Sequence, residues 1–294
     1  MSTASRFDKF LQNIKATPLQ QTAAITSANA IARKLQGYYF GTPYSDASRM
    51  IIGSYGKGTA VRPPRDIDVL FFMPPAVYHR FNAYSFNGQS ALLQEVKGLF
   101  RQRFPNTREI GGDGQVVVID FSTGHKVEVL PAWRAEGGGL LVPDTHDGGT
   151  WRQVDHDAEI KFVEDSDARS RGNTRNLIMM MKVWQTQCSV PIKSLVLEFR
   201  SVNFLSRWKY AKESSHYYDW MVRDFFGELI GKANAWHTIP GTNEKKHYGD
   251  AWLSKAQSAY ARAAKACEYE RDGKDADAAV EWRKIFGNQY EFQH

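Results

Sequence analysis

Hydrophobic residues recur at helical spacing at the start of the chain and through its second half. The first helix carries its apolar side chains on one face, at Phe7, Phe10, Leu11 and Ile14. A second helix is predicted from Pro18 to about Leu35, because Thr17, Pro18 and Gln20 form a typical helix start with a capping box. Gly37 is its predicted C-terminal stop. Beyond residue 165 the signals are mostly helical, over residues 174–187, 192–205, 217–231, 250–270 and 275–286.

Between these regions the pattern changes to that of strands. Residues 50–52 form a short apolar run, read as a buried strand, and residues 66–73 (DIDVLFFM) form a second with apolar residues on both faces. After a helix over residues 88–103, residues 115–121 and 126–130 predict a β-hairpin around Ser122-Thr123-Gly124. Residues 135–157 are rich in Gly, Asp, His and Thr and are predicted to form a mobile loop over a site. The chain is therefore expected to have a mixed α/β half followed by a helical half, with a boundary near residue 165.

Composition narrows the class of protein. The 294 residues are 42% hydrophobic and 24% charged, as in ordinary globular proteins, which argues against disorder. The chain has no run of eighteen apolar residues and its N-terminus lacks the apolar core of a signal peptide, so neither a membrane span nor a leader is expected. Two cysteines allow one disulfide at most and no Cys-rich zinc cluster, which favours the reducing cytoplasm. A net charge of +6 suggests anionic partners, either nucleic acid or small phosphates.

Two carboxylates in the second strand are the most informative residues. Asp66 and Asp68 are two positions apart on a strand, so their side chains project side by side. Such carboxylates repel, and a divalent cation such as Mg²⁺ between them removes the conflict. The alternative is a pair of exposed acids bonded to Lys or Arg. Because the strand continues as VLFFM beside a glycine-rich turn, the metal site is the favoured interpretation.

The turn that precedes these acids, GSYGKGTAVRPP, could bind phosphate. It is not a P-loop, since GxxxxGK[ST] does not fit it. Its glycines let backbone amides approach an anion, and Ser54 adds a hydroxyl donor. The alternative is a plain connector with a flexible tip. Lys57, Arg62 and Arg65 form a basic cluster beside it, ranked second because surface ion pairs explain them equally well.

A third acid is needed if two metal ions are to be held. Asp120 and Glu128 of the predicted hairpin are the candidates. If the turn centres on Thr123, Asp120 lies opposite Lys126 as a cross-strand ion pair, whereas Glu128 lies opposite the apolar Val118 rather than a cation. Glu128 is therefore preferred.

These motifs carry a family resemblance. GSYGKGTAVRPPRDIDV followed by VEVLPAW resembles the GS…DxD…[DE]-x-x-P pattern of polymerase-β-like nucleotidyltransferases, and within them the cGAS/DncV-like group (CD-NTases) of bacterial anti-phage (CBASS) systems. The similarity runs through nearly the whole chain and includes the helical segment NLIMMMKVW and the following Ile192-Lys193-Ser194. Glu128 departs from most relatives, which carry Asp. The zinc-binding insertion of the family's animal sensor has no counterpart here, so no zinc is expected.

The resemblance implies a fold and residue roles. It implies an α+β chain with a nucleotidyltransferase core and N-terminal helices over residues 1–165, a helical domain over residues 166–294, and an active site in the cleft between them. Two Mg²⁺ ions, with Mn²⁺ able to substitute, are implied at Asp66, Asp68 and Glu128. The donor triphosphate is implied at Gly53, Ser54, Lys182 and Ser194. Independently, Lys182 interrupts an apolar run, so its ammonium must either reach solvent or meet an anion, and the cleft favours the anion.

The expected function is template-independent joining of nucleoside triphosphates into a cyclic di- or trinucleotide second messenger, with release of pyrophosphate. The substrates are ATP and either GTP or another triphosphate, and the resemblance implies a downstream effector that the product activates, with a regulatory protein as a further partner. Two alternatives stay open: a synthase of linear, oligoadenylate-type products, and a catalytically silent sensor of nucleotide or nucleic acid. The three retained acids speak against the silent sensor.

Overall fold

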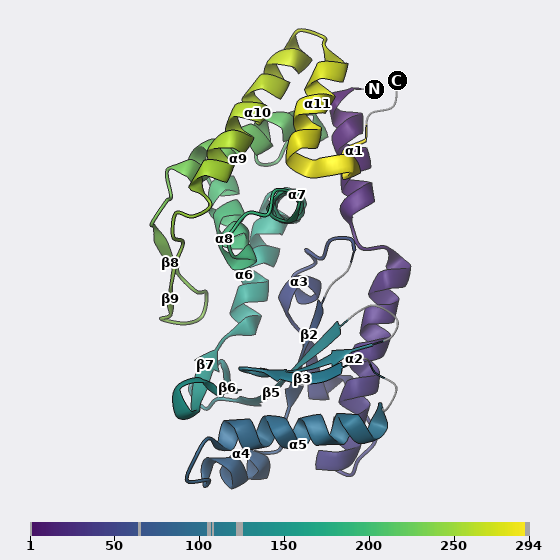
Figure 1. Cartoon of the computed structure of the whole chain (residues 1–294), viewed down its shortest axis with the longest axis vertical. Helices are drawn as coiled ribbons and strands as arrows, with labels where there is room; N and C mark the ends of the chain where they lie inside the picture. Colours follow the sequence, from purple (N-terminus) through teal and green to yellow (C-terminus); the bar gives the residue numbers. More distant parts are fainter. Residues whose placement is uncertain (1, 64–65, 105–106, 108, 122–125, 292–294) are drawn as a thin grey trace.

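The computed structural model describes residues 2–63, 66–104, 107, 109–121 and 126–291 (Figure 1). Its α-helices are α1 (Thr3–Ile14), α2 (Pro18–Tyr39), α3 (Gly53–Gly56), α4 (Pro75–Asn82), α5 (Gly88–Arg103), α6 (His156–Arg169), α7 (Asn173–Gln187), α8 (Ser194–Leu205), α9 (Tyr218–Ile230), α10 (Leu253–Arg271) and α11 (Asp275–Phe286). Its strands are β1 (Arg49–Ile51), β2 (Asp66–Phe72), β3 (Glu109–Asp113), β4 (Val116–Asp120), β5 (Lys126–Arg134), β6 (Leu140–Asp144), β7 (Thr150–Val154), β8 (Trp236–Thr238) and β9 (Lys245–His247).

A mixed sheet forms the centre of the first half. Its strands lie in the order β1-β2-β5-β4-β3, while β6 pairs with β5 and β7 pairs with β6. The β2–β5 pair is parallel, and the other pairs of this sheet are antiparallel. The mixed sheet with its helices confirms the predicted α+β class.

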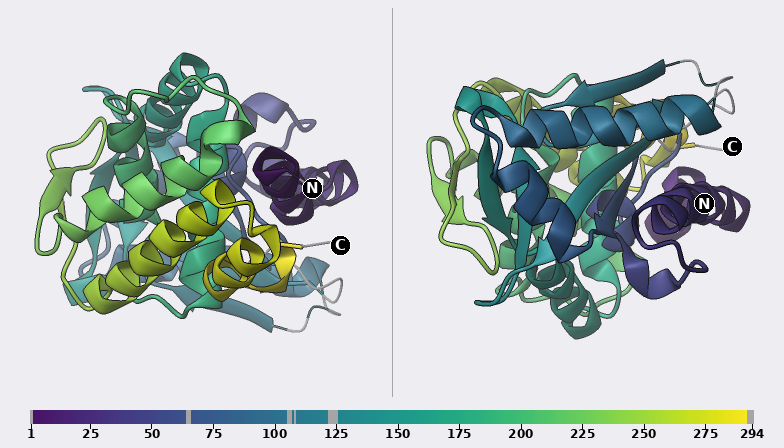
Figure 2. Two further views of the ribbon diagram at one scale, coloured as in Figure 1. Left: turned by 90° about the horizontal axis from the view of Figure 1, so that it is seen from above. Right: turned by 90° about the horizontal axis from the view of Figure 1, so that it is seen from below.

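The two faces of the sheet have different partners. Ile67, Val69 and Phe71 of β2 alternate with Asp66, Asp68 and Leu70, so the two sets lie on opposite faces. The first set packs with residues of α2, α4 and α5, which cover one side of the sheet (Figure 2). The acids therefore lie on the other face, toward the helical half.

The first helix packs with the last ones, although they are far apart in the sequence. In Figure 1, α1 lies beside α11, and both ends of the chain are at the same end of the molecule. Phe7 contacts the ring of Trp282 edge-on at 5.2 Å, and Phe10 lies 4.6 Å from the Phe286 ring. Both residues are fully buried in a core shared with α7 to α11. Helix α1 thus stabilises the helical half, and α2 continues from it toward the sheet.

The helix predictions are largely confirmed, but the predicted C-terminal end of α2 is wrong. The capping box of α2 is present: Gln20 N donates to Thr17 Oγ1 at 3.2 Å, and Thr17 N donates to Gln20 Oε1 at 2.9 Å. Gly37 was expected to end this helix, but α2 continues to Tyr39. The chain leaves the helix at Gly41, whose φ of +62° is a conformation that glycine adopts readily.

The prediction of a mobile loop over residues 135–157 is wrong. Strands β6 and β7 occupy most of it, and Leu140 and Val142 of β6 are buried against Leu130 and Ala132 of β5. The glycines that suggested a loop fall in two turns, Gly137, Gly138 and Gly139 between β5 and β6, and Gly148 and Gly149 between β6 and β7. The same composition fits a hairpin, because turn residues concentrate at its tip.

Other elements differ from the sequence predictions. The apolar run 50–52 is a half-buried edge strand, β1, and the glycine-rich turn begins with the short helix α3. Elements α4, α6, β3, β8 and β9 were not predicted. Residues 122–125, the predicted hairpin turn, lie outside the described residues. Residue 165 lies inside α6, and the division into residues 1–165 and 166–294 stays a prediction.

No helix in the described ranges is both long enough and apolar enough to cross a membrane.

We expect Phe7→Ala to destabilise the fold strongly, because it empties a fully buried site between α1 and the C-terminal helices. Such truncations cost about 3–5 kcal/mol of unfolding free energy. Phe86, whose side chain is 90% exposed, provides the matched control, and Phe86→Ala should change stability by less than about 0.5 kcal/mol. Urea unfolding of both variants measures the difference, and equal losses would contradict the packing role of α1.

Candidate active site

One cavity brings together the seven residues that were predicted to hold the metal ions and the donor triphosphate. It has a volume of about 540 Å³ and lies between the turn after β1, the acid-bearing face of the sheet and helices α7 and α8. The predicted residues that line it are Gly53, Ser54, Asp66, Asp68, Glu128, Lys182 and Ser194. The placement is a structural fact, and the roles of these residues stay predictions.

Strand pairing places the acids next to one another. In the parallel β2–β5 pair, Asp68 lies directly beside Glu128, and Asp66 lies beside Lys126. On the other edge of β5, Glu128 is opposite Val118 and Asp120 is opposite Lys126, which confirms the predicted hairpin register. Asp120 does not line the cavity, whereas the other three acids do.

Asp68 is held in a setting that disfavours its charge. Burial raises the pKa of this carboxyl above its ordinary value, and the neighbouring charge of Asp66 raises it further. His156, Lys57 and Lys182 act in the opposite direction. Partly buried acids that repel one another in this way would gain from a cation placed between them.

Gly53 fits the turn against Asp68 so closely that no side chain could replace its hydrogen. A Cβ at this position would lie 1.7 Å from Asp68 Oδ2, and the φ of Gly53 is +59°. The backbone ties the turn to the strand as well, since Ile52 N donates to Asp68 O at 2.9 Å. Ser54 follows at the second position of α3, where amide N–H groups have no acceptor within the helix.

Lys182 is buried and ion-paired. Its side chain is 7% exposed, so it does not reach bulk solvent. Lys182 Nζ lies 2.7 Å from Glu198 Oε1 and donates to Thr59 Oγ1 at 2.8 Å. The anion that the sequence required is thus, in this structure, a carboxylate of the protein. Ser194, at the start of α8, donates its hydroxyl to Gln185 Oε1 at 2.9 Å.

Sequence reasoning missed several charged and polar residues of the cavity. Thr59, His156, Glu159 and Glu198 all line it. Glu159 Oε2 lies 2.8 Å from Lys57 Nζ, and His156 Nδ1 lies 3.3 Å from Glu159 Oε1. The signal for Glu198 was a carboxylate inside the apolar run SLVLEF of α8, a position that an unpaired acid would not occupy.

The basic cluster of the turn divides in the structure. Lys57 lines the cavity and is buried between Glu159 and Glu198. Arg62 instead donates its side chain to the carbonyl of Gln12 in α1 and does not line the cavity. Arg65 lies outside the described residues.

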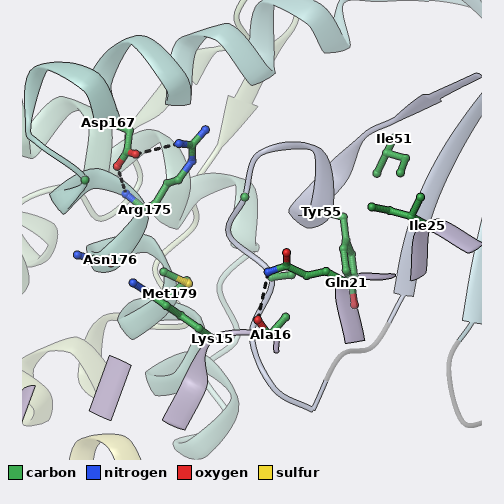
Figure 3. Close-up of a pocket in the computed structure, with 13 residues that line it drawn as sticks. Lys15, Ala16, Gln21, Ile25, Ile51, Tyr55, Asp167, Arg175, Asn176 and Met179 are labelled. Carbon is green, nitrogen blue, oxygen red and sulfur yellow. Dashed lines mark hydrogen bonds and ion pairs between the residues drawn. The ribbon is translucent and has the colours of Figure 1, made fainter. Parts of the chain in front are cut away.

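A second cavity, of about 510 Å³, also borders the turn, at Tyr55, Gly58 and Ala60 (Figure 3). Tyr55 and Ala60 line both cavities, but none of the seven predicted residues lines the second one. Among the described residues that line it, Asp167 is the one carboxylate, and it lies 2.9 Å from Arg175. Dashed lines in Figure 3 mark this ion pair. The first cavity is therefore the candidate active site, because it alone collects the acids and Lys182.

The three acids provide the oxygen ligands that Mg²⁺ prefers. Within the described ranges, no three His, Cys, Asp or Glu side chains are grouped as a ready-made metal cage. Mg²⁺ commonly keeps several waters and is held by one or two carboxylates together with substrate phosphates. Carboxylates on adjacent strands beside an open cavity fit that kind of site.

Comparison with known proteins identifies the family. A model described as the Second Messenger Oligonucleotide or Dinucleotide Synthetase domain matches residues 1–166, more than half of the chain. The chain belongs to this family. The match with this family confirms the predicted cGAS/DncV-like affiliation. The protein is a nucleotidyltransferase of the class that makes oligonucleotide second messengers. A search of curated proteins gave no match.

Solved structures show that this synthetase shares the fold of bacterial relatives. CdnC of E. coli MS115-1, in a complex with HORMA-deltaN, is 16% identical, with a TM-score of 0.75 and coverage of 98% of each chain. A point mutant of the Vibrio cholerae di-nucleotide cyclase DncV, in complex with ATP, GTP and 5MTHFGLU2, is 13% identical, with a TM-score of 0.75. That likeness covers 98% of this chain and 95% of the DncV chain. The predicted nucleotidyltransferase fold is confirmed.

Gly53→Ala should disable the synthetase, because the added methyl group occupies the position of the Asp68 carboxylate. We expect turnover of nucleoside triphosphates to fall at least about a hundredfold, or about 3 kcal/mol in the activation barrier. Gly37→Ala is the control: a Cβ there meets nothing within 4 Å, and the residue is inside α2. That variant should keep full activity and gain about 0.5–1 kcal/mol of stability. Similar activities of the two variants would refute the close fit at Gly53.

Proposed function

We propose that the synthetase joins nucleoside triphosphates, without a template, into a cyclic di- or trinucleotide with release of pyrophosphate. The observation that carries the proposal is the gathering of Asp66, Asp68 and Glu128 in one cavity with Ser54 and Lys182. Acids for metal ions lie on one wall, and donors for phosphate lie on the others. This combination suits phosphoryl transfer, in which positioning and charge neutralisation do most of the work.

Each residue has a role in this proposal. Asp66, Asp68 and Glu128 would hold two Mg²⁺ ions, which lower the pKa of the acceptor hydroxyl and stabilise the leaving pyrophosphate when bound. The backbone of Gly53 and the hydroxyl of Ser54 would bind the β- and γ-phosphates, because the start of α3 offers amide donors there. Lys182 and Ser194 would reach the same triphosphate from α7 and α8 and so fix the donor across the cavity.

The partners follow from the same proposal. The substrates would be ATP and either GTP or another triphosphate, as in the DncV complex with ATP and GTP. CdnC was captured with HORMA-deltaN, so a regulatory protein of that kind is a candidate partner here. The cyclic product would activate a downstream effector in the cytoplasm as part of anti-phage defence.

Product analysis tests the proposal directly. The purified synthetase is incubated with labelled triphosphates and Mg²⁺, and the products are separated before and after phosphatase treatment. A phosphatase-resistant product supports cyclisation, whereas a phosphatase-sensitive ladder means a linear product. No turnover, with or without added DNA or a regulatory protein, would indicate a silent sensor.

Asp66→Asn with Asp68→Asn should abolish product formation and leave the fold intact. The amides keep the shape of the acids but lose the charge that a metal ion needs. Burial and the repulsion between the two acids raise the pKa of Asp68, which means that its charge is disfavoured in the folded protein. Removing the two charges should therefore leave the melting temperature unchanged or slightly higher. Triphosphate consumption near the wild-type rate would contradict the metal role, and inactivity due to unfolding would appear in the melting curve.

Glu128→Gln and Asp120→Asn separate the two acids of the hairpin. Glu128 lines the cavity beside Asp68, so its amide should reduce turnover at least about a hundredfold, or about 3 kcal/mol in the barrier. Asp120 faces Lys126 across the strands, and its amide should cost only about 0.2–1 kcal/mol of stability. The measurement is triphosphate consumption at saturating Mg²⁺. A dead Asp120→Asn enzyme beside a nearly normal Glu128→Gln enzyme would reassign the third ligand.

A further inference from the structure

Glu198 bridges two lysines that come from different parts of the chain. Its Oε1 lies 2.7 Å from Nζ of Lys182 in α7, and its Oε2 lies 3.0 Å from Nζ of Lys57 in the turn after α3. One carboxylate of α8 thus connects the turn that leads into the sheet with the helical half.

The bridge is buried and its charges balance. Lys57, Lys182 and Glu198 are 5%, 7% and 6% exposed. Glu159 supplies the second carboxylate, 2.8 Å from Lys57 Nζ, so two positive groups face two negative ones. Burial alone lowers the pKa of Lys57, but the charges of Glu198 and Glu159 outweigh it and raise the pKa to about 12. Burial raises the pKa of Glu198, yet the two lysines hold it below its ordinary value, so Glu198 carries its negative charge in the bridge.

Two of the three donors of Lys182 have fixed partners. The ammonium group carries three N–H bonds. One points to Glu198 Oε1 and one to Thr59 Oγ1 at 2.8 Å, an arrangement that fixes the position of Nζ. Among the described residues, Nζ has no third hydrogen-bond partner, and Lys182 lines the cavity, so the third donor can bind an anion there.

Net stabilisation of the fold is a weak explanation for such a bridge. Removing charges from water costs several kcal/mol per ion, and packed apolar residues often serve stability equally well. Glu198 is flanked by apolar residues in α8, where an apolar side chain would fit the pattern. A charged residue retained at the wall of the active-site cavity is better explained by what it does to the lysines.

We propose that Glu198 is a positioning residue that holds Lys182 Nζ where the triphosphate binds, and that it does so through simultaneous contact with Lys57. The proposal rests on the function proposed above. A lysine–glutamate pair plays the corresponding part in protein kinases, where it must form before the lysine can engage the phosphates. Here the second contact, to Lys57, makes the position of Lys182 depend on the docking of the turn that carries Gly53 and Ser54.

Binding of a substrate analogue tests the proposal without turnover. The probe is the α,β-methylene analogue of ATP with Mg²⁺, titrated calorimetrically into the full-length protein. Glu198→Gln should weaken its binding at least about tenfold, since the amide cannot hold two ammonium groups. Glu198→Asp keeps the charge but is one methylene shorter, and it should also weaken binding by several-fold. Wild-type affinity in Glu198→Asp would mean that charge alone matters and would overturn the positioning role.

Glu281 provides the matched control. It is also 6% exposed and also contacts two cations, Lys284 at 2.7 Å and Arg262 at 3.3 Å, but it lies in α11 and does not line the cavity. Glu281→Gln should lower the melting temperature and leave binding of the analogue unchanged. If both glutamine variants weaken binding equally, Glu198 has only a structural role.

A double-mutant cycle with Lys182→Met identifies the route of the effect. If Glu198 acts through Lys182, the tenfold loss should shrink to less than about threefold in the Lys182→Met background. Full additivity, or tighter binding by Glu198→Gln than by the wild type, would overturn the proposal. Absence of binding to the wild-type protein would refute the proposed function itself, whereas normal wild-type binding with an unaffected Glu198→Gln variant refutes only the role of Glu198.

Discussion

The parallel pairing of β2 with β5 is the constraint on which the site depends. Because side chains alternate along a strand, the register that sets Asp68 beside Glu128 also sends Val69 and Val129 into the core under α2, α4 and α5. A shift of one residue would turn Glu128 into that apolar core and expose the valines. The hydrophobic face therefore fixes the register, and the register brings the acids together.

Gathering acids in this way has an electrostatic cost that the surrounding elements offset. Burial and the charge of Asp66 raise the pKa of Asp68, while Lys57, Lys182 and His156 lower it. None of these three groups belongs to the strands that carry the acids. The turn after α3, helix α7 and the start of α6 supply them, so the acidic wall is stable only when the elements around the cavity are in place.

The helical half is joined to the rest of the molecule at two levels. Helix α1 packs in the core of the C-terminal helices and leads directly into α2, which lies on the sheet. At the cavity, Glu198 of α8 holds Lys57 of the turn and Lys182 of α7. A core contact at one end and a buried ion-pair bridge at the other therefore fix the sides of the cavity relative to each other.

The sequence by itself determined most of the local elements and pointed to the candidate residues of the site. Helical periodicity and the capping box predicted most helices of the C-terminal half and the start of α2, because these signals depend on neighbouring residues. The spacing of Asp66 and Asp68, the glycine-rich turn and the hairpin register pointed to the residues that now line one cavity. The strands β6 and β7 were missed, because the Gly and Asp residues of their turn dominated the composition of the segment.

Only the tertiary structure decided which distant residues meet. Nothing near Glu198 in the sequence indicates that its carboxylate lies between Lys182 and Lys57, the second of which is 141 residues away along the chain. The packing of α1 with α11 could not be predicted either, because an apolar helix face indicates that the face is buried but does not identify the element that covers it. Hydrophobic periodicity predicts which face of an element is buried, whereas the element that packs against this face depends on the tertiary structure of the whole chain.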